Sequence, residues 1–295
     1  MTDSRAVALM LAAFLIMMTA LPGGAATRPH PGKFYVVSTG PAGPELATLK
    51  AIDTMKRADL VLCTARTAKS FQAYLQGKKM EDPWRKLWVY HGKIWMKELS
   101  TFKPEERQKV VALKSRERDE FVKRLKGLLA QGKNVVLLDG GDPTIFSRAY
   151  WLLKGLPEDQ VEIIPGVGAY TAAMAALKKA GTGGGARFVL QTAPFAFFGR
   201  NNQDDLARAL SPFPGTLVFY MGLSKIDQIV STLKKYKPGD LPVAVVYYAG
   251  YPHKQKVVKG TLDNILAKIA PEKEHWLGMI IVGRAITGPA FVLSH

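Results

Sequence analysis

Residues 140–143, GGDP, are the part of the chain whose residue types are best suited to holding a ligand. Gly140 and Gly141 would let a ligand approach the main chain without meeting a Cβ atom. Asp142 and Pro143 also fit a purely structural function, because aspartate is a good helix N-cap and proline favours the first helical position. GGDP alone is therefore compatible both with a ligand site and with a simple helix start.

The segments on both sides of GGDP indicate how it is positioned. Residues 134–138 form a β-branched, apolar run that is typical of a buried parallel strand. Beyond GGDP, apolar residues recur at helical spacing, namely Ile145, Ala149, Leu152 and Leu153. We therefore expect a strand-to-helix crossing at the carboxyl end of a strand, where open α/β sheets bind their ligands.

The first half of the chain repeats this strand–turn–helix pattern. We predict strands at residues 34–38, 60–63, 134–138 and 161–164. Helices are predicted around residues 46–55, around 121–128 and at 171–179. Residues 64–118 show no clear pattern, although LWVYH at 87–91 is compatible with a strand. Alternating strands and helices of this kind indicate a parallel sheet.

The second half begins a new set of elements after GTGGGA at residues 181–186, which we interpret as a hinge. Strands are predicted within 186–193, 215–222, 242–251, 255–262 and 278–284. Helices are predicted at 204–210, at 224–236 with Ser224 as the N-cap, and at 264–270. The predicted fold class is therefore α/β, with two α/β domains in series, at residues 33–180 and 186–295.

Charge and cysteine content limit the kinds of partner and site. The 41 Lys and Arg exceed the 24 Asp and Glu, giving a net charge of +17 that favours nucleic acid, acidic lipid or a carboxylated small molecule. Cys63 is the only cysteine, so no disulfide can form within the chain, and its apolar context LVLC suggests a small buried residue. Scattered histidines and the absence of HExxH and CxxC argue against a metal site.

The N-terminal segment resembles a signal peptide. Arg5 precedes an apolar run at residues 6–21, and Gly24 and Ala26 are small residues suited to a cleavage site. The run is shorter than the roughly 20 residues of a membrane span. We therefore expect residues 1–26 to be a cleaved signal peptide and the protein to be periplasmic or otherwise exported.

A membrane anchor is the alternative for the same segment. Arg28 and Lys33 follow the apolar run, and the positive-inside rule would then keep the body of the protein on the cytoplasmic side. In that case the protein would associate with the membrane through residues 1–26.

Two common nucleotide motifs are absent. TGPAGPE at residues 39–45 has two glycines but no lysine where a P-loop needs one, and neither Walker A nor GxGxxG fits. This argues against an ordinary dinucleotide or triphosphate site, although a turn of this kind can still cap an adenosyl ligand.

Five segments together resemble the tetrapyrrole (corrin/porphyrin) methylase family, whose motifs they follow in order from Lys33 to Arg284. They are STGPAGPELATLKAIDTMKRADLVL, VVLLDGGDPTIFSR, VEIIPGV, TLVFYMG and DLPVAVVYYAGYPHKQKVVKGTLDNI. The last two are most similar to the precorrin-4 carbon-11 methylase branch. The resemblance implies two α/β domains with S-adenosylmethionine in the cleft between them, a homodimer, and methyl transfer to a carbon of a carboxylated tetrapyrrole, a precorrin or porphyrinoid.

The resemblance also implies a set of cofactor-binding residues. Carried over position by position, they are Pro41, Gly140, Gly141, Asp142, Ile145, Gly168, Ala169, Met221 and Gly250. Glycines at such positions allow main-chain hydrogen bonds to the ligand, and Ile145 and Met221 would supply apolar walls for the adenosyl group. The catalytic base is not identified by the sequence.

The chain departs from the family pattern at two positions. Thr64 stands where uroporphyrinogen methylases carry an aspartate proposed as base, which puts methylation through that base in doubt. Gly168 stands where many relatives have serine or threonine, which removes one side-chain hydrogen bond to the cofactor.

Other polar residues are compatible both with a function and with a structural or surface role. His91 and Tyr90 are candidates for the base. Four cations are candidates for binding substrate carboxylates, namely Arg66, Lys86, Lys93 and Arg148.

Two other functions remain compatible with the sequence. One is an RNA methyltransferase of the same fold, which the charge of +17 would suit, although GGDP and the FYMG context favour a tetrapyrrole over nucleic acid. The other is a non-catalytic protein that binds a tetrapyrrole or an adenosyl ligand. Export would favour this second function, because S-adenosylmethionine is made in the cytoplasm.

Overall fold

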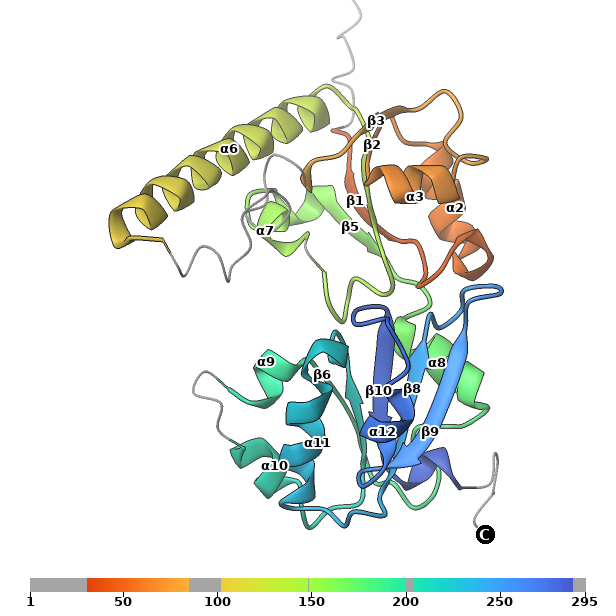
Figure 1. The fold of residues 1–295 in the computed structure, drawn as a ribbon. Coiled ribbons are helices and arrows are strands. Elements are labelled where there is room, and N and C mark those ends of the chain that lie inside the picture. Colours follow the sequence, from red (N-terminus) through yellow and green to blue (C-terminus); the bar gives the residue numbers. More distant parts are fainter. Residues whose placement is uncertain (1–30, 85–101, 148, 200–203, 289–295) are drawn as a thin grey trace, which may run out of the picture.

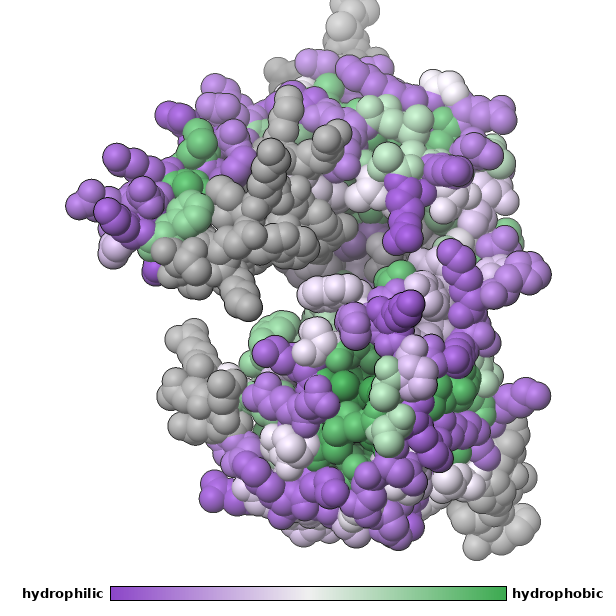
Figure 2. All heavy atoms as spheres, in the orientation of Figure 1, coloured by the Kyte–Doolittle hydropathy of each residue, from purple (hydrophilic) through white to green (hydrophobic). Residues whose placement is uncertain are grey.

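The computed structural model describes residues 31–84, 102–147, 149–199 and 204–288. Within them the chain forms two five-stranded sheets, each with its own helices, and the two domains lie end to end (Figure 1). In Figure 2 a hollow separates the two domains on the side where α6 and α9 lie. This arrangement confirms the predicted class of two α/β domains in series.

The first sheet is parallel throughout and has the order β3-β2-β4-β1-β5. Its strands are β1 (Phe34–Ser38), β2 (Leu60–Leu62), β3 (Lys79–Glu81), β4 (Val135–Asp139) and β5 (Val161–Ile164). The central strand β4 is buried along its whole length, which explains its continuous apolar run. Strand β3 was not predicted, because its sequence KME is short and largely exposed.

Helices cover both faces of the first sheet. They are η1 (Pro44–Leu46), α2 (Leu49–Lys56), α3 (Ala65–Ser70), α6 (Pro104–Ala130), α7 (Tyr150–Leu153) and η2 (Glu158–Gln160). Helix α2 starts at the N-cap Thr48, whose hydroxyl accepts a hydrogen bond from Ala51 N–H, and packs Met55 on one face. On the other face α6 contributes Phe121, Leu125 and Leu129 to a second cluster.

The segment after GGDP differs from the prediction. Asp142 does not cap a helix and Pro143 does not begin one, because residues 143–145 form a turn and α7 starts only at Tyr150. The Asp142 carboxylate instead accepts hydrogen bonds from the N–H and the hydroxyl of Thr144, at 2.9 and 2.7 Å. An aspartate that closes a local turn in this way competes with helix formation.

The second sheet is mixed and has the order β6-β7-β10-β8-β9. Its strands are β6 (Val189–Thr192), β7 (Thr216–Phe219), β8 (Pro242–Tyr247), β9 (Lys256–Thr261) and β10 (Gly278–Val282). Strands β6 and β7 are parallel, whereas β10 runs antiparallel to both β7 and β8. The carboxyl ends of β7 and β8 therefore lie on the same edge of the sheet.

The helices of the second half are α8 (Ala169–Leu177), α9 (Pro194–Phe197), α10 (Asp205–Ala209), η3 (Leu223–Lys225), α11 (Ile226–Lys234), α12 (Ile265–Ile269) and η4 (Arg284–Ile286). The prediction of Ser224 as an N-cap is wrong. Ser224 lies inside η3, and α11 begins after Lys225 with no side-chain cap bond.

Helix α8 packs with the second sheet although it precedes the predicted hinge at 181–186. Its apolar face joins one cluster with strands β7, β8 and β10 through Ala172, Ala173, Met174 and Leu177. By packing, the second domain therefore starts at α8 rather than after the glycine-rich segment.

Cys63 is 3% exposed, as its apolar context predicts. Across the ranges that the structure describes, no helix is both long and apolar enough to cross a membrane. The expected signal peptide at 1–26 and the possible strand at 87–91 lie outside the described residues.

Candidate functional site

Three loops of the first domain meet at one edge of its sheet. They follow β1, β4 and β5, and these three strands are neighbours in the order β4-β1-β5. Because all three are parallel, their carboxyl ends lie at the same edge. This brings Pro41, the GGDP turn and the residues before α8 together, although Pro41 precedes GGDP by 99 positions in the sequence. In Figure 1 the loop after β4 extends from this edge toward the second domain.

The two glycines of GGDP face open space. Within the part of the chain that the structure describes, a Cβ atom built on either Gly140 or Gly141 would meet no other atom within 4 Å. Gly141 has φ +74°, its N–H donates to the Gly40 carbonyl at 2.8 Å, and its own carbonyl accepts a hydrogen bond from the Ser38 hydroxyl. Hydrogen bonds with Gly40 and Ser38 thus fix the turn on one side, and the glycine Cα atoms on the other side leave room for a ligand to contact the main chain.

Asp139, which sequence reasoning did not select, supports this turn. It is 6% exposed, and its carboxylate accepts hydrogen bonds from Gly140 N–H, at 3.1 Å, and from the Ser147 hydroxyl. Buried charge needs such partners. An aspartate at the end of the buried strand VVLLD was the available sequence signal.

Gly168 and Ala169 lie beside Asp142. A Cβ atom on Gly168 would be 3.4 Å from the Asp142 Cβ, so the start of α8 packs closely on the GGDP turn. Gly168 is the N-cap of α8 and makes no side-chain cap bond. The start of α8 therefore has no side-chain cap, and the expected loss of a side-chain hydrogen bond to the cofactor at Gly168 stays a prediction.

Apolar side chains from both domains are exposed near these loops. Ile145 of the first domain is 39% exposed, and Met221, which follows β7 in the second domain, is 50% exposed. Met221 also has φ +52°, a conformation that side chains other than glycine rarely adopt. Exposed apolar side chains on strained backbone suit the walls of a ligand site.

An aromatic contact joins the two domains beside these residues. The ring centroids of Phe146 and Tyr220 lie 5.0 Å apart, with 57° between the ring planes. In the sequence Phe146 directly follows Ile145, and Tyr220 directly precedes Met221. The Tyr220 hydroxyl donates to Gln191 Oε1 at 2.6 Å, and burial raises the pKa of Tyr220 to about 12. The phenol therefore stays protonated and serves packing rather than proton abstraction.

Gly250 brings the turn after β8 against the first domain. It has φ +83°, and a Cβ atom there would lie 2.5 Å from Leu46 Cδ1 and 3.5 Å from Ala42 Cβ. Only glycine fits this approach to the loop that contains Pro41. Residues of the second domain thus reach the edge formed by the first.

Thr64 takes a structural role in α3. It is the N-cap, its hydroxyl accepts from Thr67 N–H at 3.3 Å, and the two hydroxyls lie 3.1 Å apart. Arg66 is exposed on the same helix. The other candidates for base or carboxylate binding lie outside the described residues; they are Lys86, Tyr90, His91, Lys93 and Arg148.

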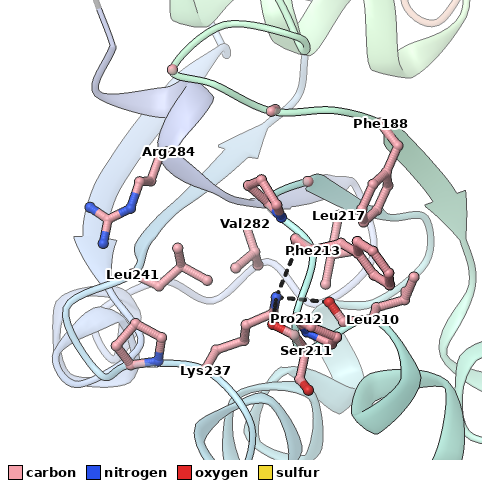
Figure 3. A pocket seen from close by; sticks show the side chains of 15 residues that line it. Phe188, Leu210, Ser211, Pro212, Phe213, Leu217, Lys237, Leu241, Val282 and Arg284 are labelled. Carbon is pink, nitrogen blue, oxygen red and sulfur yellow. Dashed lines mark hydrogen bonds between the residues drawn. The ribbon is translucent and has the colours of Figure 1, made fainter.

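A separate cavity of about 280 Å³ lies at the far end of the second domain, near the starts of β6 and β7 (Figure 3). Its walls include Phe188, Leu217 and Val282. Lys237 Nζ donates to three main-chain carbonyls at 2.8–3.0 Å, those of Leu210, Ser211 and Phe213. Burial lowers the pKa of Lys237, but its hydrogen bonds are internal, so we place the candidate site at the interdomain edge and not here.

Comparison with known proteins agrees with the family resemblance seen in the sequence motifs. The model of the tetrapyrrole (corrin/porphyrin) methylases matches residues 33–266. A uroporphyrinogen-III C-methyltransferase of Methanocaldococcus jannaschii is 30% identical over 264 residues, covering 86% of this chain and 97% of the relative. A precorrin-4 C(11)-methyltransferase of Mycobacterium tuberculosis is 34% identical over 186 residues, covering 60% and 72%.

Solved structures share the fold. A cobalt precorrin-4 methyltransferase superimposes with a TM-score of 0.65 at 20% identity, covering 86% of this chain and 95% of the other. A uroporphyrin-III C-methyltransferase from Thermus thermophilus, complexed with S-adenosylhomocysteine, gives 0.58 at 23% identity, covering 87% and 99%. The two-domain fold, the ordered motifs and these relatives show that the chain belongs to the tetrapyrrole (corrin/porphyrin) methylase family.

Proposed function

We propose that this protein is an S-adenosylmethionine-dependent methyltransferase that acts on a carbon of a carboxylated tetrapyrrole. The observation that carries the proposal is the convergence of the family's cofactor positions from both domains. Gly140, Gly141 and Gly168 come from loops of the first sheet's edge, and Met221 and Gly250 come from the facing edge of the second. Ligand sites at domain interfaces commonly have this form.

The residues at this edge fit an adenosyl ligand. Open space over Gly140 and Gly141 allows main-chain contacts, and Ile145 and Met221 offer exposed apolar surface. One solved relative is a complex with S-adenosylhomocysteine, the product form of the proposed methyl donor. When bound, S-adenosylmethionine supplies a sulfonium methyl group that is already activated for transfer.

The chain's own contribution is then alignment and the exclusion of water. The Phe146–Tyr220 ring contact joins the two domains beside the site and helps to position its two sides. Correct alignment of two reactants can supply up to about 7 to 11 kcal/mol of a barrier. Neither Thr64, which caps α3, nor the protonated Tyr220 is suited to act as the base.

Binding of the cofactor product tests the first part of the proposal. Titration calorimetry of the full-length protein should show S-adenosylhomocysteine binding at micromolar to millimolar concentration. No binding at millimolar ligand would end the proposal, including its version as a non-catalytic adenosyl binder.

Methyl transfer tests the acceptor. Labelled S-adenosylmethionine should transfer its methyl group to uroporphyrinogen III or to a precorrin mixture, the acceptor classes named for the relatives. The net charge of +17 favours such polycarboxylates, and it also suits RNA. Label that appears only in total RNA would reverse the assignment, and binding without any transfer would favour a binding protein.

We also propose, from the sequence features alone, that the protein is exported after cleavage at residue 26 and that it forms a homodimer. N-terminal sequencing of protein from the native host should give a start at Thr27. An intact N-terminus in the membrane fraction would support the cytoplasm-facing anchor instead. Light scattering coupled to gel filtration of the full-length protein would test the dimer, for which the mass of one full-length chain, 32.3 kDa, is the contrary result.

A further inference from the structure

Three aromatic residues gather on the edge of the second domain that faces the first. Tyr248 and Tyr251 follow β8, and Trp276 precedes β10, whose start pairs with the end of β8. Trp276 is 65% exposed, and both tyrosines are only partly buried. We call Tyr248, Tyr251 and Trp276 the aromatic patch. Figure 1 places the loop before β10 at the end of the second domain nearest the first.

Glu274 holds the aromatic patch in one arrangement. Its Oε1 accepts hydrogen bonds from the N–H groups of Trp276 and Leu277, at 2.7 and 3.0 Å. Its Oε2 accepts from the Tyr248 hydroxyl. The Tyr251 ring meets the Tyr248 ring edge-on, with 5.9 Å between centroids and 81° between planes. Hydrogen bonds to Glu274 therefore hold the Tyr248 side chain and the main chain of Trp276 in place, which lowers the ordering cost of binding a ligand there.

Backbone strain is concentrated in the same place. Among the described residues, four other than glycine have positive φ: Lys178, Met221, Tyr248 and His253. Lys178 ends helix α8, whereas the other three lie in the loops after β7 and β8, at the edge facing the first domain. Strained backbone persists where the surrounding structure enforces it, and it clusters at ligand sites.

Positive charge borders the aromatic patch from both domains. Lys254 Nζ lies 6.0 Å from the centroid of the Tyr248 ring. The pKa of Tyr248 is raised, first by its hydrogen bond to Glu274 and then by burial, while the charge of Arg66 on α3 acts in the opposite direction. The charge of Arg66 thus acts on the Tyr248 hydroxyl from the other domain. The Glu274 carboxylate at the Tyr248 ring is already occupied by internal hydrogen bonds.

The aromatic patch adjoins the proposed cofactor position. Gly250 lies in the same turn as Tyr248 and Tyr251, and this turn touches the loop that carries Pro41. A molecule resting on the aromatic patch would thus lie close to the proposed methyl donor.

We infer that the aromatic patch binds one face of the tetrapyrrole acceptor, with Arg66 and Lys254 pairing with its carboxylates. This inference rests on the proposed function. Rings that are exposed, ordered and bordered by cations are suited to a large, unsaturated, polyanionic ligand, because stacking and charge-assisted hydrogen bonds then act together.

The test uses the full-length protein and uroporphyrin III, a stable tetrapyrrole with carboxylate side chains, as the probe. Absorbance titration measures its affinity, and calorimetry measures that of S-adenosylhomocysteine. Trp276→Ala should weaken uroporphyrin binding about tenfold, because one stacking contact contributes at least about 1 kcal/mol and about 1.4 kcal/mol corresponds to a tenfold change in affinity. Trp276→Phe should retain most of the affinity, and both variants should bind S-adenosylhomocysteine like the wild type.

A matched control is Phe213→Ala, because Phe213 is 47% exposed at the cavity on the far end of the same domain. It should leave uroporphyrin binding unchanged. Arg66→Ala should weaken binding at low salt, and the difference should vanish at about 1 M salt, where the Debye length is about 3 Å.

The outcomes separate this inference from the proposed function. If Trp276→Ala binds uroporphyrin with wild-type affinity, the aromatic patch is not the acceptor site. Methyl transfer by the wild type would still support the proposed function in that case. A wild type that binds S-adenosylhomocysteine but no uroporphyrin would overturn both the acceptor site and the tetrapyrrole assignment.

Discussion

Gly140→Ala is the sharpest test of where the cofactor binds, because it separates binding from stability. The φ angle of Gly140 lies outside the left-handed region, and a Cβ atom there would meet no atom of the described residues within 4 Å. Alanine should therefore fit without strain. The substitution should raise the free energy of unfolding by up to about 1 kcal/mol, through lower entropy of the unfolded chain.

Binding should respond in the opposite direction. The new methyl group would occupy the space in which we place the ligand's contact with the main chain. Loss of that contact should weaken S-adenosylhomocysteine binding at least about tenfold, which corresponds to about 1.4 kcal/mol.

Two further glycines serve as controls. Gly141→Ala also meets no atom, but its φ of +74° should cost about 1 to 2 kcal/mol of stability and weaken binding as well. Gly127→Ala, in α6, should raise stability by about 0.5 to 1 kcal/mol and leave binding unchanged.

The assays are denaturant unfolding and titration calorimetry on the same preparations. If Gly140→Ala folds as expected and binds S-adenosylhomocysteine with wild-type affinity, the placement of the cofactor over GGDP is refuted.

Three further outcomes can be measured on the same protein. Burial, and secondarily the charge of Asp82, raises the pKa of Cys63 to about 11, so a thiol reagent at about pH 8 should modify this residue only after unfolding. Because its ordinary value is 9.0, the thiol's contribution to stability should be lost as the pH rises from 9.0 to about 11, and rapid labelling of the native protein would contradict this. Phe146→Ala removes an aromatic pair worth about 0.5 to 1.5 kcal/mol and should weaken S-adenosylhomocysteine binding. Tyr220→Phe keeps the two rings in contact and should bind S-adenosylhomocysteine nearly as the wild type does. An equal loss of affinity in both variants would argue against the ring contact as the cause. Leu125→Ala at a fully buried position of α6 should cost about 2 to 5 kcal/mol in denaturant unfolding, against about 0.5 kcal/mol or less for Leu113→Ala, which is 43% exposed on the same helix.

Local sequence signals predicted most strands but not every connection between them. The apolar runs at β1, β4 and β8 are buried along nearly their whole length, so composition alone identified them. The turn after β4 was predicted as a helix start, because an aspartate followed by proline suits both structures. The structure has a turn there, because the N–H and the hydroxyl of Thr144 both donate hydrogen bonds to the Asp142 carboxylate.

The supporting residues of the candidate site could not be found from motifs. Ser38 and Ser147 hold the GGDP turn through side-chain hydrogen bonds to residues 103 and 8 positions away. Phe146 and Tyr220 meet from different domains. No periodicity in the sequence marks contacts of this kind, because they depend on which loops become neighbours.

The sequence by itself determined the class of fold, the family motifs and the residues that follow each strand. These are local properties, since hydrophobic spacing and turn residues act within a few positions. Only the tertiary structure decided that β4, β1 and β5 lie side by side, that α8 belongs to the second core, and that the Glu274 carboxylate accepts hydrogen bonds from both Tyr248 and Trp276. Strand order and domain packing depend on the burial of apolar faces between segments that are far apart in the sequence. Because several strand orders are compatible with the same hydrophobic pattern, the sequence pattern alone does not select one of them.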